Sequence, residues 1–222
     1  MENNFTQTKK VTFDRNSAVS MNEIAKTVFA PIYPVIARNA LVVTGIEKGV
    51  CLDLGSGPGM LAISMAIEAP ELEVVAFDFN EDARSVAADN ISEAGLTDRI
   101  GTLTGDVHDI PYEDERIDLI VSRGSMFFWE DLKGAFREIW RILAPGGATY
   151  LGGGFGSLAL RDQVIREMAV RDPEWKCYAK KMDDKGRERF EKMFMEIGCE
   201  NHYRIIDDDT GMWVVLRKPE KS

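Results

Sequence analysis

The sequence predicts an α/β fold with a doubly wound, mostly parallel β-sheet, and three observations support this prediction. Between residues 49 and 151, short apolar runs alternate with helical patterns, as is typical of successive βαβ units. A glycine-rich turn joins the first apolar run to the first of those helices. Near the end of the chain, residues 202–206 and 212–216 flank a turn, which is the pattern of a β-hairpin.

The N-terminal part of the chain is predicted to be helical after a polar start. Residues 1–20 are polar, and we expect them to be loosely ordered. A helical pattern follows at 21–44, but Pro31 and Pro34 interrupt it. Because proline lacks the N–H group that a helix interior requires, we expect two short helices.

The alternating part of the chain contains continuous apolar runs, which indicate strands buried on both faces of a sheet. The predicted strands lie at 49–54, 74–77, 100–104, 117–121 and 148–151, and the predicted helices between them at 61–69, 81–94 and 131–143. We expect Pro145-Gly146-Gly147 to close the last of these helices. After the glycine run at 152–156, two or three helices follow without an intervening strand.

The most informative segment is the turn after the first strand, where glycine occupies positions 55, 57 and 59. Glycine leaves no Cβ in the way of a ligand, and the first N–H groups of the helix that follows point toward the turn. These features predict a nucleotide-like cofactor.

Two details of this turn distinguish between cofactor classes. A dinucleotide site prefers G-x-G-x-x-G, but Met60 stands where the third glycine should be, and Gly59 comes one position early. Asp53 places a carboxylate just before the turn, which suits an ammonium group better than a pyrophosphate. A nicotinamide dehydrogenase is therefore the weaker alternative.

The pattern Asp53-x-Gly55-x-Gly57-x-Gly59 resembles the first motif of class I S-adenosylmethionine-dependent methyltransferases. The resemblance implies a Rossmann-like, seven-stranded sheet with an antiparallel C-terminal hairpin strand. It also implies S-adenosyl-L-methionine as cofactor and S-adenosyl-L-homocysteine as product. The chain would then be one domain, with an N-terminal helical lid at 1–45, a cofactor-binding core at 49–152, a helical insertion at 153–198 and a terminal hairpin at 199–222.

The same resemblance assigns cofactor contacts after the next three strands. Asp78 is placed to reach the ribose hydroxyls, although it could instead be a strand-end residue or cap the following helix. Asp106 and the Val107 N–H would meet the adenine edge, and Arg123 would pair with a carboxylate or support its loop. The full set of predicted cofactor residues is Asp53, Gly55, Ser56, Gly57, Gly59, Met60, Asp78, Phe79, Asp106, Val107, Ser122 and Arg123.

No catalytic residue follows firmly from the sequence. Methyl transfer from a sulfonium requires mainly alignment of the acceptor and exclusion of water, and it needs a general base only when the acceptor atom carries a proton. Tyr33, His108, Arg123 and Trp129 are the candidates near the acceptor.

The acceptor is predicted to be a small molecule. The segment Gly134–Gly147 is similar to that of the ubiquinone- and menaquinone-biosynthesis group of the family. The net charge of −10 disfavours nucleic acid and anionic membranes. A non-catalytic S-adenosylmethionine-binding sensor or partner protein remains an alternative.

Cysteine spacing and hydropathy limit the remaining possibilities. Cys51, Cys177 and Cys199 show no metal-ligand spacing, so we expect no metal, and a metalloid methyltransferase would require Cys177 and Cys199 to converge. Without a signal peptide or an apolar run of membrane-spanning length, we expect a cytoplasmic monomer or homodimer.

Overall fold

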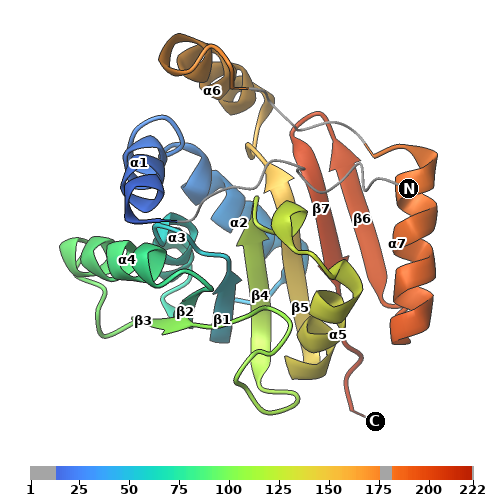
Figure 1. The fold of residues 1–222 in the computed structure, drawn as a ribbon. Coiled ribbons are helices and arrows are strands. Elements are labelled where there is room, and N and C mark those ends of the chain that lie inside the picture. The colour runs from blue at the N-terminus through green and yellow to red at the C-terminus, as the bar shows by residue number, and fades with distance from the viewer. Residues whose placement is uncertain (1–13, 176–181, 222) are drawn as a thin grey trace.

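A computed structural model describes residues 14–175 and 182–221 of the chain. A seven-stranded sheet with the order β3-β2-β1-β4-β5-β7-β6 forms its centre, and helices cover both faces (Figure 1). β1 to β5 are parallel, whereas β7 runs antiparallel to both β5 and β6. The strands are β1 (Lys48–Leu54), β2 (Glu71–Asp78), β3 (Ile100–Thr104), β4 (Ile117–Arg123), β5 (Leu143–Gly154), β6 (Tyr203–Asp208) and β7 (Gly211–Leu216). The predicted fold class is confirmed.

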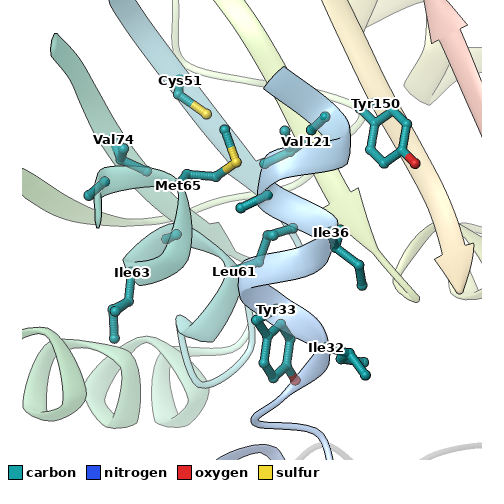
Figure 2. Packing of buried hydrophobic residues seen from close by; sticks show 14 of the residues in the cluster. Ile32, Tyr33, Ile36, Cys51, Leu61, Ile63, Met65, Val74, Val121 and Tyr150 are labelled. Carbon is teal, nitrogen blue, oxygen red and sulfur yellow. The ribbon is translucent and has the colours of Figure 1, made fainter. Parts of the chain in front are cut away.

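The helices form two layers, each with its own apolar core. They are α1 (Arg15–Lys26), α2 (Ile32–Thr44), α3 (Met60–Glu68), α4 (Glu81–Glu93), α5 (Leu132–Ile142), α6 (Leu158–Arg171), α7 (Asp184–Ile197) and a short 3₁₀ helix, η1 (Met126–Phe128). On one face, Ile36 of α2 and Met65 of α3 share a core with Cys51 of β1 (Figure 2). On the other face, α5 and α7 cover β4, β5 and β7.

The N-terminal helices correct one expectation. Two short helices are present, with Pro31 at the N-cap of α2 and Pro34 in its first turn, where a missing N–H group costs nothing. However, α1 begins at Arg15, within the segment expected to be loosely ordered. Asp14 and Ser17 cap it reciprocally, since the Ser17 N–H donates to Asp14 Oδ1 (2.8 Å) and the Asp14 N–H to Ser17 Oγ (2.8 Å). Such a capping box fixes the helix start.

Pro145-Gly146-Gly147 does not close a helix, contrary to the prediction. α5 ends at Ile142, and β5 begins at the next residue, so the three residues lie inside a strand. The pairing register between β4 and β5 shifts at this point, and Gly146 has φ +79°. This conformation favours glycine, so the segment is a strand irregularity.

The glycines at the end of β5 are required by close packing. A Cβ atom on Gly152 would lie 1.9 Å from the Met212 carbonyl oxygen of β7, and one on Gly153 would lie 2.7 Å from the Phe127 ring. The run therefore lets the terminal hairpin and η1 approach β5 directly.

Candidate functional site

The glycine turn adopts the backbone that its sequence demands. Gly55, Gly57 and Gly59 have φ values of +66°, +53° and +80°, a region that disfavours residues with a side chain. A Cβ on Gly55 would lie 2.3 Å from Ser125 Cβ, but one on Gly57 would have no atom within 4 Å. The turn is thus packed at its start and open at its middle, where a ligand can approach the backbone.

Asp53 is a buried carboxylate behind this turn. It is 1% exposed, and its Oδ2 accepts a hydrogen bond from the Ala62 N–H in the first turn of α3 (3.1 Å). Burial raises the pKa of Asp53 to about 7, although the Ser56 hydroxyl and the Ala62 N–H partly oppose the rise. The Ser56 hydroxyl is itself buried without a hydrogen bond of standard geometry within the described residues. A cation beside Asp53 would offset the cost of ionising it.

Asp78 joins the ends of β1 and β2. Its carboxylate accepts hydrogen bonds from the Gly57 N–H (2.8 Å) and from the Asn80 N–H (2.9 Å), and burial raises its pKa. The N-cap of α4 is Asn80, whose side chain accepts from Asp82 and Ala83. Asp78 is therefore not the N-cap of this helix, although it is the last residue of β2. The next residue, Phe79, is 57% exposed.

The loop after β3 is tied both to Asp78 and to α5. The Gly105 N–H donates to the Asp78 carbonyl (3.0 Å). His108 Nδ1 lies 2.6 Å from Asp106 Oδ1, and His108 Nε2 lies 3.0 Å from the Asp131 carbonyl. Hydrogen bonds from the His108 backbone N–H and ring lower the pKa of Asp106. Both ring nitrogens of His108 thus lie within hydrogen-bond distance of protein oxygens, which suits a positioning role rather than that of a base. Val107, between Asp106 and His108 in the sequence, is half-buried.

The loop after β4 is tied to the end of β1. Ser122 is fully buried, and its hydroxyl lies 2.6 Å from that of Ser125, which donates to the Leu54 carbonyl (2.9 Å). The hydroxyl of Ser122 thus supports the loop, and a direct cofactor contact from this residue stays a prediction.

Arg123 lies between aromatic side chains that the sequence did not point to. Its guanidinium carbon is 4.5 Å from the centre of the Phe29 ring and 5.8 Å from that of Phe155, distances at which a cation is attracted to a ring. Its Nε donates to the Gly154 carbonyl (3.3 Å). Phe29 follows α1, and Phe155 sits inside the glycine run, so neither carries a local signal for the site.

Tyr33 belongs to the same region. It lies near the start of α2, at the end of the sheet toward which the arrows of β4 and β5 point (Figure 2). Burial raises its pKa, the positive charge of Arg123 opposes this, and the negative charge of Asp53 adds to it. Tyr33 is therefore within electrostatic range of both charged residues.

Trp129, which the sequence grouped with Tyr33 near the acceptor, belongs to the other of the two apolar cores. It packs edge-on against Phe136 of α5 (ring centres 6.3 Å apart). With Met126 and Phe127 it lines a cavity of about 380 Å³ between η1, α5 and α7. None of the predicted cofactor residues lines this cavity.

The described residues also bear on metals, thiols and membranes. Burial raises the pKa of the Cys199 thiol to about 11, and Cys177 lies outside the described residues. Within 14–175 and 182–221, no three His, Cys, Asp or Glu side chains are placed to hold a metal ion. No helix in these ranges is both long and apolar enough to cross a membrane.

Comparison with known proteins identifies the family. Residues 52–151 match the family model for a methyltransferase domain. A crystal structure of a proposed S-adenosyl-L-methionine-dependent methyltransferase from Methanococcus maripaludis is 47% identical, with a TM-score of 0.89, over 98% of this chain and 99% of that one. The chain belongs to the S-adenosylmethionine-dependent methyltransferases. The cosubstrate of this family is S-adenosylmethionine.

More distant relatives in the family act on different acceptors. Demethylmenaquinone methyltransferase from Thermus thermophilus is 33% identical over 112 residues, which are 50% of each protein. The U6 snRNA (guanine-N(2))-methyltransferase THUMPD2 of Mus musculus is 35% identical over 104 residues, 45% of this chain and 20% of that protein. This methyltransferase chain thus spans a fifth to a half of the length of these relatives.

The residues present fit S-adenosylmethionine. The open backbone at Gly57 admits a ligand, and the buried Asp53 suits an ammonium group. Asp78, Phe79 and Asp106 follow along the ends of β2 and β3, in the order ribose, adenine face and adenine edge that the family resemblance implies. The individual contacts remain predictions.

Proposed function

We propose that the protein transfers a methyl group from S-adenosylmethionine to a small molecule with an apolar or aromatic body. The supporting observation is the aromatic environment beside the cofactor turn. Phe29 and Phe155 contact Arg123, and Tyr33 is within range of its charge. These residues gather at the carboxyl ends of β4 and β5, next to the predicted methionine end of the cofactor.

S-adenosylmethionine supplies a methyl group already activated by the positive sulfonium. The chain then has to hold, orient and enclose the reactants. Asp53 would hold the ammonium group, Asp78 the ribose and Asp106 the adenine. His108 orients Asp106, and we expect α2 to limit the access of water to the aromatic residues. A general base is needed in addition only if the acceptor atom carries a proton.

The net charge of −10 supports a small acceptor over RNA, because a polyanion would be repelled at long range. One relative acts on RNA and another on a quinone precursor, judging by their names, so family membership alone does not choose between them. We therefore rest this choice on the charge and on the aromatic residues.

The test is to incubate the protein with methyl-labelled S-adenosylmethionine and three fractions of a cell extract: small metabolites, RNA and protein. We expect label in the metabolite fraction, and loss of that label with Asp78→Asn. Label only in RNA or protein would overturn the proposed acceptor class. Tight binding of S-adenosylhomocysteine with no labelled product in any fraction would instead support the non-catalytic sensor.

A further inference from the structure

Asn90 occupies a junction between three segments of the chain. It lies on α4 and is 6% exposed. Its Nδ2 donates to the Pro58 carbonyl (2.8 Å) and to Asn22 Oδ1 of α1 (2.8 Å), and its Oδ1 accepts from Lys26 Nζ (3.3 Å). Both N–H groups and the oxygen of the amide are thus engaged, as a buried amide requires.

One of these partners belongs to the cofactor turn. Pro58 lies between Gly57 and Gly59, and a Cβ on Gly59 would be 3.1 Å from Ala87 Cβ of α4. The turn therefore rests directly on α4, one helical turn from Asn90. The Pro58 carbonyl thus links the turn to this amide.

The other two partners belong to α1. Asn22 and Lys26 are four residues apart and share one face of this helix. Of the residues in α1, Ala25 alone is buried, so the apolar contribution to its docking is small. Its recorded contacts with the rest of the described chain are largely polar: Asn22 and Lys26 to Asn90, Lys26 to Glu93, and Glu23 to Arg171.

An element held in this way opens at low free-energy cost. A small apolar side chain would suffice at position 90 if the junction served packing alone, since a buried amide is costly unless each of its polar groups is bonded. The amide instead fixes the distance between the turn and α1.

We propose that Asn90 is a positioning residue that couples the cofactor turn to α1, so that cofactor binding orders α1 and a docked α1 strengthens cofactor binding. The coupling is reciprocal because both events act on the same equilibrium. This inference rests on the proposed function, in that the turn must hold S-adenosylmethionine or its product.

Hydrogen–deuterium exchange of residues 15–26, with and without S-adenosylhomocysteine, tests the coupling together with calorimetric affinities. In the unmodified protein we expect the ligand to slow exchange in α1. In Asn90→Leu we expect this protection to disappear and the affinity to fall roughly tenfold, the effect of losing a buried hydrogen bond.

Three further variants make the test specific. Asn90→Asp keeps the shape of the side chain and its contact with Lys26, but it cannot donate hydrogen bonds to Pro58 or Asn22. It should therefore behave like Asn90→Leu, and it replaces that variant in the test if Asn90→Leu does not fold. Asn22→Ala keeps the Pro58 bond and should lose the α1 protection with a smaller loss of affinity. Asn39→Leu removes a half-buried amide that donates to Gly156 instead, and should leave α1 protection intact.

The outcomes separate this inference from the proposed function. If the unmodified protein does not bind S-adenosylhomocysteine, the proposed function fails and the inference fails with it. If it binds, and folded Asn90 variants keep both the affinity and the protection of α1, the coupling is wrong while the function stands.

Discussion

At the scale of single residues, Asp53 combines burial with the charge that the proposed cofactor contact needs. In the folded chain its pKa is about 7, against an ordinary value of 3.8. The carboxyl group is therefore partly protonated near neutral pH unless a cation lies beside it. In the proposed site the ammonium group of the cofactor would favour the ionised form, so we expect binding and ionisation to be linked.

This linkage predicts a pH-dependent affinity. Below about pH 7 the ligand must displace a proton from Asp53, so the affinity for S-adenosylhomocysteine should increase as the pH rises from about 5.5 to about 7.5. Asp53→Asn should bind at least about tenfold more weakly at the upper end and lack this dependence. Calorimetric titrations across the range measure both, and an unchanged pH profile in Asp53→Asn would contradict the assignment.

The same carboxylate should limit stability. The folded-state pKa is raised, so the contribution of Asp53 to stability is fully present below about pH 4 and is lost as the pH rises through about 7. Asp53→Asn, which can still accept the Ala62 N–H, should therefore gain thermal stability relative to the unmodified protein, and more at about pH 8 than at about pH 5. A melting-temperature difference that shrinks with rising pH would show that Asp53 is not buried as described.

His108 should act through Asp106. Without the ring, Asp106 loses the contact that orients it, so His108→Ala should weaken S-adenosylhomocysteine binding by roughly three- to tenfold, the effect of about one hydrogen bond. His202→Ala is the matched control. His202 stacks on Trp140, and neither residue is among the predicted cofactor residues. Equal effects of the two substitutions on binding would remove the positioning role of His108.

At the scale of elements, two positions of the glycine turn are expected to affect stability and ligand binding differently. In Gly55→Ala the new methyl group meets Ser125 at 2.3 Å, and we expect a loss of about 3 kcal/mol in unfolding free energy. In Gly57→Ala the methyl group enters open space, so the loss should be about 1–2 kcal/mol from the positive φ alone. Gly57→Ala should nevertheless bind S-adenosylhomocysteine at least about tenfold more weakly.

Urea denaturation and calorimetry on the two variants check this contrast. If Gly57→Ala binds S-adenosylhomocysteine as tightly as the unmodified protein does, the open middle of the turn does not face the ligand, and the proposed site is contradicted.

The glycine run at the end of β5 makes a prediction about stability only. Gly152→Ala would place a methyl group 1.9 Å from the Met212 carbonyl, so β7 must shift, at a cost of about 3 kcal/mol or more. Gly101→Ala in β3 is the control, because a Cβ there meets nothing within 4 Å, and its effect should stay below about 1 kcal/mol. Equal denaturation midpoints for the two variants would refute the packing explanation.

Elements that a short segment encodes by itself were predictable from the sequence. The turn at Gly55–Gly59 and the predicted strand 100–104 needed only local periodicity and glycine spacing. The prediction that Pro145-Gly146-Gly147 closes a helix was wrong, because a helix end and an irregular strand use the same residue types. Only the pairing of this segment with β4 and with Lys218 distinguishes the two.

Contacts between distant segments were not predictable in this way. Phe29 precedes the first strand in the sequence and Phe155 follows the fifth, yet both rings lie close to the Arg123 guanidinium. Asn90 donates a hydrogen bond to Pro58, which is 32 positions away. The placement of Trp129 near the acceptor stays a prediction, since an aromatic residue after a strand looks the same whether it faces a site or a core.

At the scale of the whole molecule, the topology and the motifs agree on one place. The strand order reverses between β1 and β4, and open α/β sheets bind ligands at the carboxyl ends of the strands at such a point. Asp53, Asp78, Asp106 and Arg123 all stand at or just after those ends. The cavity between η1, α5 and α7 lies on the opposite layer from α2 and α3.

The most direct test is calorimetric titration of the unmodified protein with S-adenosylhomocysteine and, separately, with a pyridine dinucleotide. The turn at residues 53–59 should bind the first with micromolar affinity at one site per chain and give no heat with the second. Tight binding of the dinucleotide, with no heat from S-adenosylhomocysteine, would contradict the account.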